Sequence, residues 1–261
     1  MRLLPVHRED KMNLFTSNYK ILSSDCDRYG IWKMNRILVL LQELSGEHSD
    51  LLGLSFEETL ALGAVWVVTR NEFEVLRYPA ISQTVVGKTF PGRARRGIYP
   101  RYYLIEDLQG RPLVRASSFW ALADVTTRQM TDIPEVQNRM PDTSDLTPFF
   151  HNPAAADELA QGLRRQALWQ PVYTDLDRNG HVNNTRAADW ALCFLSEAAD
   201  LRAHPVRRVL ASYHHEIMQG DMVSMHFACD CPDFSLRCDV GDNLALRLSG
   251  SLFDQAPVPG D

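Results

Sequence analysis

A segment of 13 residues occurs twice in this chain, and this duplication restricts the fold more than any other feature. Residues 24–36 align with residues 174–186 without a gap. Five of the 13 positions are identical, namely Asp25/Asp175, Asp27/Asp177, Arg28/Arg178, Gly30/Gly180 and Arg36/Arg186. The chain shows no shorter repeat with a period of about 20 to 50 residues, so a solenoid is not indicated. The pattern predicts two related units in tandem.

The sequence around each copy supports this prediction. An extended apolar stretch precedes each copy, at residues 14–22 and at residues 168–173. Apolar residues with helical spacing follow each copy. After the first copy they are Ile37, Leu38, Leu40, Leu41 and Leu44, and after the second they are Ala187, Trp190, Ala191, Phe194, Leu195 and Ala198. We therefore expect one long helix in each unit.

Strand-like runs follow both predicted helices. In the first unit they are residues 66–75, 101–106 and 113–123, and in the second they are residues 209–217, 222–229, 234–238 and 244–248. The first run of each set ends with an acid, which aligns Glu74 with Glu216. A long helix against an antiparallel sheet is an α+β arrangement. Pairing of the two sheets would give a pseudo-dimer of tandem units, with clefts between them that suit a ligand.

The segment between the units has the composition of a linker. Residues 131–162 contain Pro134, Pro141, Pro148 and Pro153, which favour a path over the surface. Within this segment, residues 154–159 predict a short helix. The expected organisation is an N-terminal tail at 1–13, an N-terminal unit at 14–130, a linker at 131–162 and a C-terminal unit at 163–261.

Composition excludes several classes of function. The chain has 261 residues, of which 45% are apolar and 23% charged, as in an ordinary globular protein. A net charge of −6 argues against nucleic acid as a partner. No stretch approaches the roughly 18 apolar residues of a membrane span, and the first 13 residues lack the apolar core of a secretory signal. The five cysteines lack the spacing of a zinc site, so we expect reduced thiols in a cytoplasmic protein without metal or cofactor.

The two copies differ at the positions that can carry chemistry. The second copy has Asn179, His181, Asn183 and Asn184 where the first has Tyr29, Ile31, Lys33 and Met34. The shared acids and glycine are typical of a turn that enters a helix, with Asp as cap and Gly at positive φ. Such a turn needs neither an imidazole nor three asparagines. An ordinary loop histidine remains the alternative interpretation.

These side chains match the needs of water addition to a carbonyl. His181 is the residue type that changes protonation near neutral pH. A helix N-terminus beside it offers free N–H groups for a developing oxyanion. Glu216, in the same unit, could supply a base or orient one, although an exposed strand acid is an equal alternative.

The same residues resemble the signature of a known family. Residues 177–184, Asp-Arg-Asn-Gly-His-Val-Asn-Asn, are followed by an apolar helix that contains Trp190. This string resembles the signature of acyl-acyl carrier protein (acyl-ACP) thioesterases, double hotdog-fold enzymes that end fatty acid synthesis. Residues 66–70 and 115–124, with Thr127 and Arg128 after them, resemble the N-terminal half of these enzymes. The resemblance covers roughly residues 14–250.

The resemblance implies that Asp177, Asn179, His181 and Glu216 form the catalytic group. Asn179 would hold the thioester carbonyl or the attacking water, Glu216 and His181 would activate the water, and Asp177 would orient its neighbours. Which of Glu216 and His181 takes the proton stays open.

One departure from the family bears on the mechanism. Plant members carry a cysteine after this glutamate, and this chain has Ile217 there. We therefore expect direct attack by water. Cys193 lies near the apolar side of its predicted helix and is expected in the core.

The resemblance also implies a substrate and a partner. The expected reaction is hydrolysis of acyl-ACP to a free fatty acid, and the expected partner is an acidic carrier protein with a phosphopantetheine arm. An acyl-CoA thioesterase and a non-catalytic acyl-binding protein are the alternatives, and both a monomer and a homodimer are compatible with the sequence. The candidate substrate-binding residues are Asn183, Asn184, Trp66, Arg70 and Trp120, and the candidate tunnel residues are Met34, Leu38, Leu41, Trp66, Val68, Trp120 and Leu122. The candidate docking residues are Arg93, Arg95, Arg96, Arg164 and Arg165, with ordinary solvated arginines as the alternative.

Overall fold

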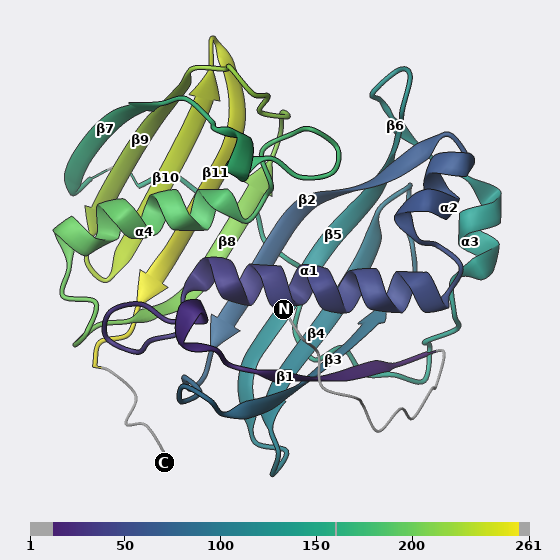
Figure 1. The fold of residues 1–261 in the computed structure, drawn as a ribbon, viewed down its shortest axis with the longest axis horizontal. Helices are drawn as coiled ribbons and strands as arrows, with labels where there is room; N and C mark the ends of the chain where they lie inside the picture. Colours follow the sequence, from purple (N-terminus) through teal and green to yellow (C-terminus); the bar gives the residue numbers. More distant parts are fainter. Residues whose placement is uncertain (1–12, 160, 256–261) are drawn as a thin grey trace.

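The computed structural model describes residues 13–159 and 161–255, which form one antiparallel sheet with helices packed against it (Figure 1). The expected tail lies outside the described residues except for Asn13. The helices are α1 (Met34–Leu51), α2 (Phe56–Ala61), α3 (Pro134–Arg139) and α4 (Arg186–Ala198). The strands are β1 (Phe15–Lys20), β2 (Ala64–Val75), β3 (Thr84–Pro91), β4 (Tyr99–Asp107), β5 (Pro112–Asp124), β6 (Met130–Thr131), β7 (Leu163–Trp169), β8 (Val206–Tyr213), β9 (Val223–Asp230), β10 (Asp233–Val240) and β11 (Asn243–Leu252).

The order of the strands displays the duplication. The sheet has 11 strands in the order β1-β3-β4-β5-β2-β8-β11-β10-β9-β7, with β6 paired to β5. In each half the outermost strand precedes the long helix, and the strand directly after the helix region lies at the centre of the sheet. The second half therefore repeats the order of the first in reverse. The chain is a mixed α/β protein dominated by a large antiparallel sheet.

The seam between the halves consists of β2 and β8. Arg70 pairs with Ser212 and Phe73 pairs with Val209 in antiparallel register. Because these two strands hold equivalent places in the two halves, their pairing joins two sheets into one. The halves therefore share backbone hydrogen bonds as well as a side-chain core.

Both long helices cover the same face of this sheet. α1 contacts β1 and β3, α4 contacts β9, β10 and β11, and the two helices contact each other (Figure 1). The predicted apolar face of α1, Ile37, Leu38, Leu40, Leu41 and Leu44, is 0–2% exposed. Full burial of such side chains contributes about 1.5–3 kcal/mol each. Hydrophobic periodicity therefore predicted both the helices and the face that they bury.

Some strand limits differ from the expectation. The strand before the second copy is Leu163–Trp169 and not residues 168–173, because Pro171 follows it and Tyr173 starts a 3₁₀ turn. This strand lies at the edge of the sheet and is exposed throughout, so it lacks an alternating pattern. Strand β3 was not predicted. β8 ends at Tyr213, so Glu216 lies in the loop after the strand, whereas Glu74 lies within β2 and pairs with Arg208. The expected alignment of Glu74 with Glu216 is therefore wrong.

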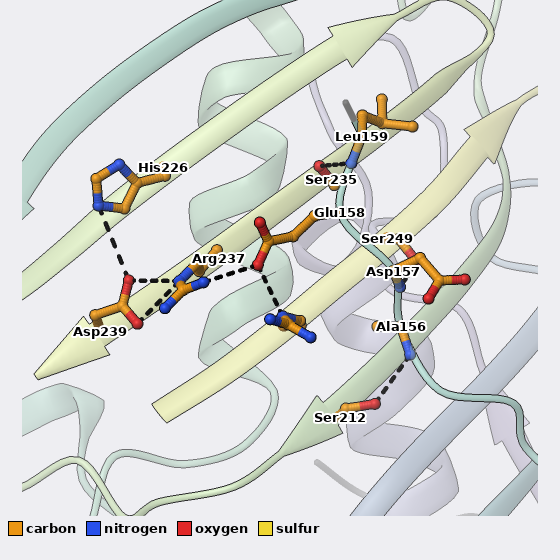
Figure 2. A network of polar contacts seen from close by, with 11 residues as sticks. Ala156, Asp157, Glu158, Leu159, Ser212, His226, Ser235, Arg237, Asp239 and Ser249 are labelled. Atoms are coloured by element: carbon orange, nitrogen blue, oxygen red, sulfur yellow. Dashed lines mark hydrogen bonds and ion pairs between the residues drawn. The ribbon is translucent and has the colours of Figure 1, made fainter. Parts of the chain in front are cut away.

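The predicted helix at residues 154–159 is wrong, because this segment runs extended across the sheet face away from α4 (Figure 2). Its backbone N–H groups donate to serine hydroxyls on the strands beneath. Ala156 donates to Ser212 at 3.0 Å, Asp157 to Ser249 at 3.2 Å and Leu159 to Ser235 at 3.1 Å. Side chains on three strands thus take the hydrogen bonds that a helix would have formed within itself.

Charged groups reinforce this contact. Glu158 lies 3.1 Å from Arg237 and 2.9 Å from Arg247, and Arg237 also bonds Asp239 (Figure 2). Earlier in the predicted linker, α3 buries Val136 in a cluster with Leu54, Tyr99 and Leu122. The segment between the halves is therefore packed onto both of them. The expected limits of the units stay a prediction.

Candidate active site

The loop of the second copy is folded by Asp177. Its Oδ1 accepts the backbone N–H of Asn179 at 2.8 Å and that of His181 at 3.3 Å. The backbone N–H of Asp177 donates to the carbonyl of His181 at 2.8 Å. Gly180 turns the chain between them at φ +77°. The carboxylate expected to orient its neighbours thus holds the backbone on which His181 is placed.

A second loop brings Glu216 to this histidine. The N–H of Val182 donates to the carbonyl of Ile217 at 2.8 Å, and His181 forms a β-bridge with Met218. These backbone contacts fix the loop after β8 beside the loop before α4. As a result, His181 Nε2 lies 3.3 Å from Glu216 Oε2. The side chain of His181 is 11% exposed, whereas that of Glu216 is 43% exposed.

Arg128 is a third member of this group, and sequence reasoning gave it no role. Its Nη1 lies 3.2 Å from His181 Nε2 and 3.4 Å from both carboxylate oxygens of Glu216. Arg128 belongs to the N-terminal half, on the turn after β5, and has a φ of +60°. Asp124 Oδ1 accepts the N–H of Thr127 at 2.7 Å and thereby folds that turn. A cation from one half therefore meets the acid and the imidazole of the other.

The contacts of Arg128 bear on the protonation of His181. A guanidinium only donates hydrogen bonds. In its contact with Arg128, the Nε2 atom of His181 is therefore the acceptor and carries a lone pair. The same nitrogen lies 3.3 Å from Glu216 Oε2, to which it could only donate, so its two contacts require opposite hydrogen positions.

The three asparagines occupy different places. Asn179 is exposed and lines the cavity described below. Asn183 Oδ1 accepts from the Thr185 N–H at 2.9 Å and the Thr185 hydroxyl at 2.8 Å, so it supports the chain where α4 begins. Asn184 donates to Gln42 of α1 at 3.2 Å, and its carbonyl accepts from Tyr213. Asn179 therefore lines the cavity, whereas Asn183 and Asn184 line it and also hold the start of α4 and its contact with α1.

These groups border a cavity of about 690 Å³ lined by both halves. Five of the predicted tunnel and substrate-binding residues line the cavity, namely Trp66, Val68, Trp120, Asn183 and Asn184. The other predicted tunnel residues, Met34, Leu38, Leu41 and Leu122, are at most 2% exposed and belong to the core rather than the cavity wall. Arg70 pairs with Ser212 at the seam and is not part of the wall.

Two further expectations need correction. α4 begins at Arg186, and within the described chain none of its residues lines the cavity, so its N-terminus does not supply the expected oxyanion donors. Cys193 is exposed and not in the core, because it lies at the outer edge of the apolar face of α4. No thiol of the described residues lines the cavity.

The predicted docking arginines form two separate groups. Arg93, Arg95 and Arg96 are exposed in the loop between β3 and β4, whereas Arg164 and Arg165 are exposed on β7. Six strands separate β4 from β7 in the sheet. At about 4.8 Å per strand, the groups lie on the order of 30 Å apart and make no single patch.

Two features are absent from the residues that the structure describes. No helix there is both long enough and apolar enough to cross a membrane. No group of three or more His, Cys, Asp or Glu side chains in residues 13–159 and 161–255 is arranged to hold a metal ion.

Family models match both halves of the chain. The acyl-ACP thioesterase N-terminal domain matches residues 12–138, and the acyl-ACP thioesterase C-terminal domain matches residues 161–246. The chain belongs to the acyl-ACP thioesterase family. This membership agrees with the resemblance seen at residues 177–184.

Individual relatives agree with this assignment. The chain is 30% identical over 193 residues to a palmitoyl-acyl carrier protein thioesterase of Cuphea hookeriana, a match that covers 69% of this chain and 46% of that protein. The chain thus spans about half the length of the curated relatives it matches.

Solved structures share the fold. A putative oleoyl thioesterase from Lactobacillus plantarum has a TM-score of 0.81 at 22% identity, covering 95% of this chain and 98% of that one. A 12:0-ACP thioesterase from Umbellularia californica has a TM-score of 0.77 at 19% identity, covering 96% and 99%. At these identities the likeness shows the fold alone.

Proposed function

We propose that this chain hydrolyses the thioester of acyl-ACP with water, releasing a free fatty acid and the carrier thiol. The observation that carries the proposal is the meeting of His181, Glu216 and Arg128 at the edge of a cavity shared by both halves. Family membership supports the substrate class. We further propose that the halves are tandem hotdog units, with acyl binding in residues 14–130 and catalysis in residues 163–261. The mirrored strand order supports this division.

In the proposed mechanism His181 is the general base. An imidazole can take a proton from water near neutral pH, and His181 lines the cavity in which the thioester would lie. The carboxylate of Glu216, 3.3 Å away, then stabilises the imidazolium that forms. We thus propose His181 as the base and Glu216 as its partner, the choice that the sequence left open.

Asn179 and Arg128 are the proposed donors to the thioester oxygen. Attack by hydroxide on the carbonyl carbon gives a tetrahedral oxyanion, which needs hydrogen-bond donors that already face it. Asn179 and Arg128 line the cavity beside His181. Collapse of the intermediate breaks the carbon–sulfur bond, and the leaving thiolate takes the proton held by His181.

The substrate class is tested by product analysis. Mass spectrometry of free acids released from a mixed acyl-ACP pool should show release that depends on the enzyme. The same acyl chains on CoA, assayed in parallel, test carrier selectivity, and faster release from CoA would replace the proposal with an acyl-CoA thioesterase. Absence of release from both pools would identify a binding protein.

For carrier docking we propose the loop that contains Arg93, Arg95 and Arg96. Pro91 and Tyr99, which flank this loop, line the cavity, whereas β7 with Arg164 and Arg165 lies at the far edge of the sheet. Replacing the three loop arginines with Ala should raise KM for acyl-ACP several-fold and leave KM for acyl-pantetheine unchanged, since only the carrier protein is acidic. The Arg164→Ala, Arg165→Ala variant is the matched control. An equal rise of KM in that control would contradict the choice of the loop.

A further inference from the structure

A buried cation faces the proposed acyl cavity from the N-terminal half. Arg101 lies on β4, is 5% exposed and lines the cavity. Alternation along the strand places Tyr99, Arg101 and Tyr103 on the same face, toward α1. Tyr103 confirms this direction, because its hydroxyl lies 2.7 Å from the Ser45 hydroxyl of α1.

Within the part of the chain that the structure describes, Arg101 has no carboxylate at ion-pair distance. A guanidinium has five N–H donors. Among the described residues, Arg101 Nη1 contacts His48 Nδ1 at 3.1 Å. Buried carboxylates of this chain, in contrast to Arg101, have partners of opposite charge. Each of Asp25, Glu72 and Asp175 pairs with an arginine. Burial lowers the pKa of the Arg101 guanidinium, but an arginine remains charged at neutral pH.

The wall of the cavity on α1 is also polar. Gln42, Ser45, Gly46 and Ser49 line the cavity and share one helix face through their spacing of three and four residues. A side chain at Gly46 would have no neighbour within 4 Å, so space is open there. Because Gln42 bonds Asn184 of the catalytic loop, this polar face starts at the proposed reaction centre. It then extends on the order of 10 Å along the helix.

A plain alkyl chain does not match these surroundings. A buried charge is stabilised by hydrogen-bond acceptors, and an acyl chain made only of methylene groups has none to offer. Trp66, Val68 and Trp120 offer apolar contacts on the sheet side of the same cavity. The cavity thus combines an apolar wall for a chain with a fixed cation for an oxygen.

We propose that Arg101 binds a hydrogen-bond-accepting oxygen on the acyl chain, at a position away from the thioester. The preferred substrates are then acyl chains that carry a hydroxyl, keto or carboxylate group, and not unsubstituted chains of the same length. The inference rests on the proposed function for the acyl group itself. It adds Arg101 as the residue that determines specificity.

Binding without turnover tests this inference. The probes are acyl amides of pantetheine, which fix the orientation of the chain and are not hydrolysed. At each chain length, a plain alkyl amide is compared by calorimetry with the amides that carry a terminal hydroxyl or a terminal carboxylate. A hydrogen bond to a charged group should make the wild type bind an oxygenated probe about 10-fold more tightly or better at the matching length.

Variants assign that preference to Arg101. Arg101→Met should abolish it, and Arg101→Lys should retain part of it. Arg115→Met, an exposed arginine on the neighbouring strand β5, should leave it unchanged. If Arg101→Met does not fold, as judged by thermal unfolding, Arg101→Gln decides the same question.

Two results would overturn the inference. The first is equal wild-type affinity for plain and oxygenated probes at every length, and the second is an undiminished preference in the folded Arg101 variants. Failure of the proposed function has a different signature. In that case no acid is released from any acyl-ACP, while the ratio of probe affinities can still be measured.

Discussion

The two copies of the duplicated loop have almost the same scaffold and different surroundings. Asp25 Oδ1 accepts from Arg36 Nε at 2.8 Å, and Asp175 Oδ1 accepts from Arg186 Nε at 2.9 Å. Both carboxylates are at most 1% exposed, and both also accept a backbone N–H three residues earlier. The duplication therefore produced two equivalent turns that lead into long helices.

The space in front of the two turns differs. The second turn, with His181, faces the cavity of about 690 Å³, whereas the first, with Ile31, faces a crevice of about 20 Å³. Tyr78, Leu192 and Val206 close that crevice. The scaffold by itself therefore carries no chemistry. In the proposed mechanism, function depends on the polar residues of the second copy and on the cavity in front of it.

Glu216 and Glu74, the two acids that the sequence aligned and the structure places differently, give the largest expected difference. Glu216→Gln should lower kcat for acyl-ACP hydrolysis about 100-fold or more, because it removes the carboxylate beside His181. Glu74→Gln is the same change in the other half, where Glu74 pairs with the exposed Arg207 at 3.3 Å. It should leave kcat unchanged and alter stability by at most about 1 kcal/mol. A similar loss of kcat in both variants would remove the distinction between the halves.

The buried acids should be equivalent in stability. Asp25→Asn and Asp175→Asn should each lower the free energy of unfolding by about 2–3 kcal/mol, because each removes the buried carboxylate that an arginine pairs with. Arg186 keeps a second partner in Asp189. Asp25 also accepts the Tyr19 hydroxyl, so its replacement should cost slightly more. Urea denaturation measures both values. A cost confined to one of the two variants would show that the turns are not structurally equivalent.

The two glycines should show a smaller and equal effect. Gly30 and Gly180 have φ values of +80° and +77°. An added Cβ would meet Ile81 at 3.6 Å in the first copy and nothing within 4 Å in the second, so backbone strain alone remains. Alanine at either position should therefore cost about 1–2 kcal/mol in the same denaturation experiment. A cost well above this range at Gly180 alone would indicate a contact specific to the second copy.

Local patterns predicted much of this molecule. The apolar faces of α1 and α4 follow from their periodicity, and the duplicated Asp, Gly and Arg positions predicted two matching turns. The placement of His181 beside Glu216 agrees with the hypothesis drawn from residue types and family resemblance. These features depend on short stretches of sequence or on comparison of one half with the other.

Contacts between distant segments were not predictable in the same way. Arg128 meets His181 across the seam, and nothing in one sequence tells which turn of the first half lies against which loop of the second. The extended segment at residues 154–159 contains good helix formers, but serines on three strands bind its backbone instead. In the sequence, Arg101 has no feature that separates it from an ordinary strand arginine, because the cavity that it lines is formed by distant segments.

The most direct test compares His181→Ala with Ile31→Ala, the same change at equivalent positions of the two copies. Both variants are assayed for free fatty acid released from acyl-ACP, and thermal unfolding confirms that both are folded. Ile31→Ala should hydrolyse at the wild-type rate, and His181→Ala should be slower by about 100-fold to 10,000-fold. Hydrolysis by a folded His181→Ala variant at the wild-type rate would contradict the assignment of catalysis to the second copy.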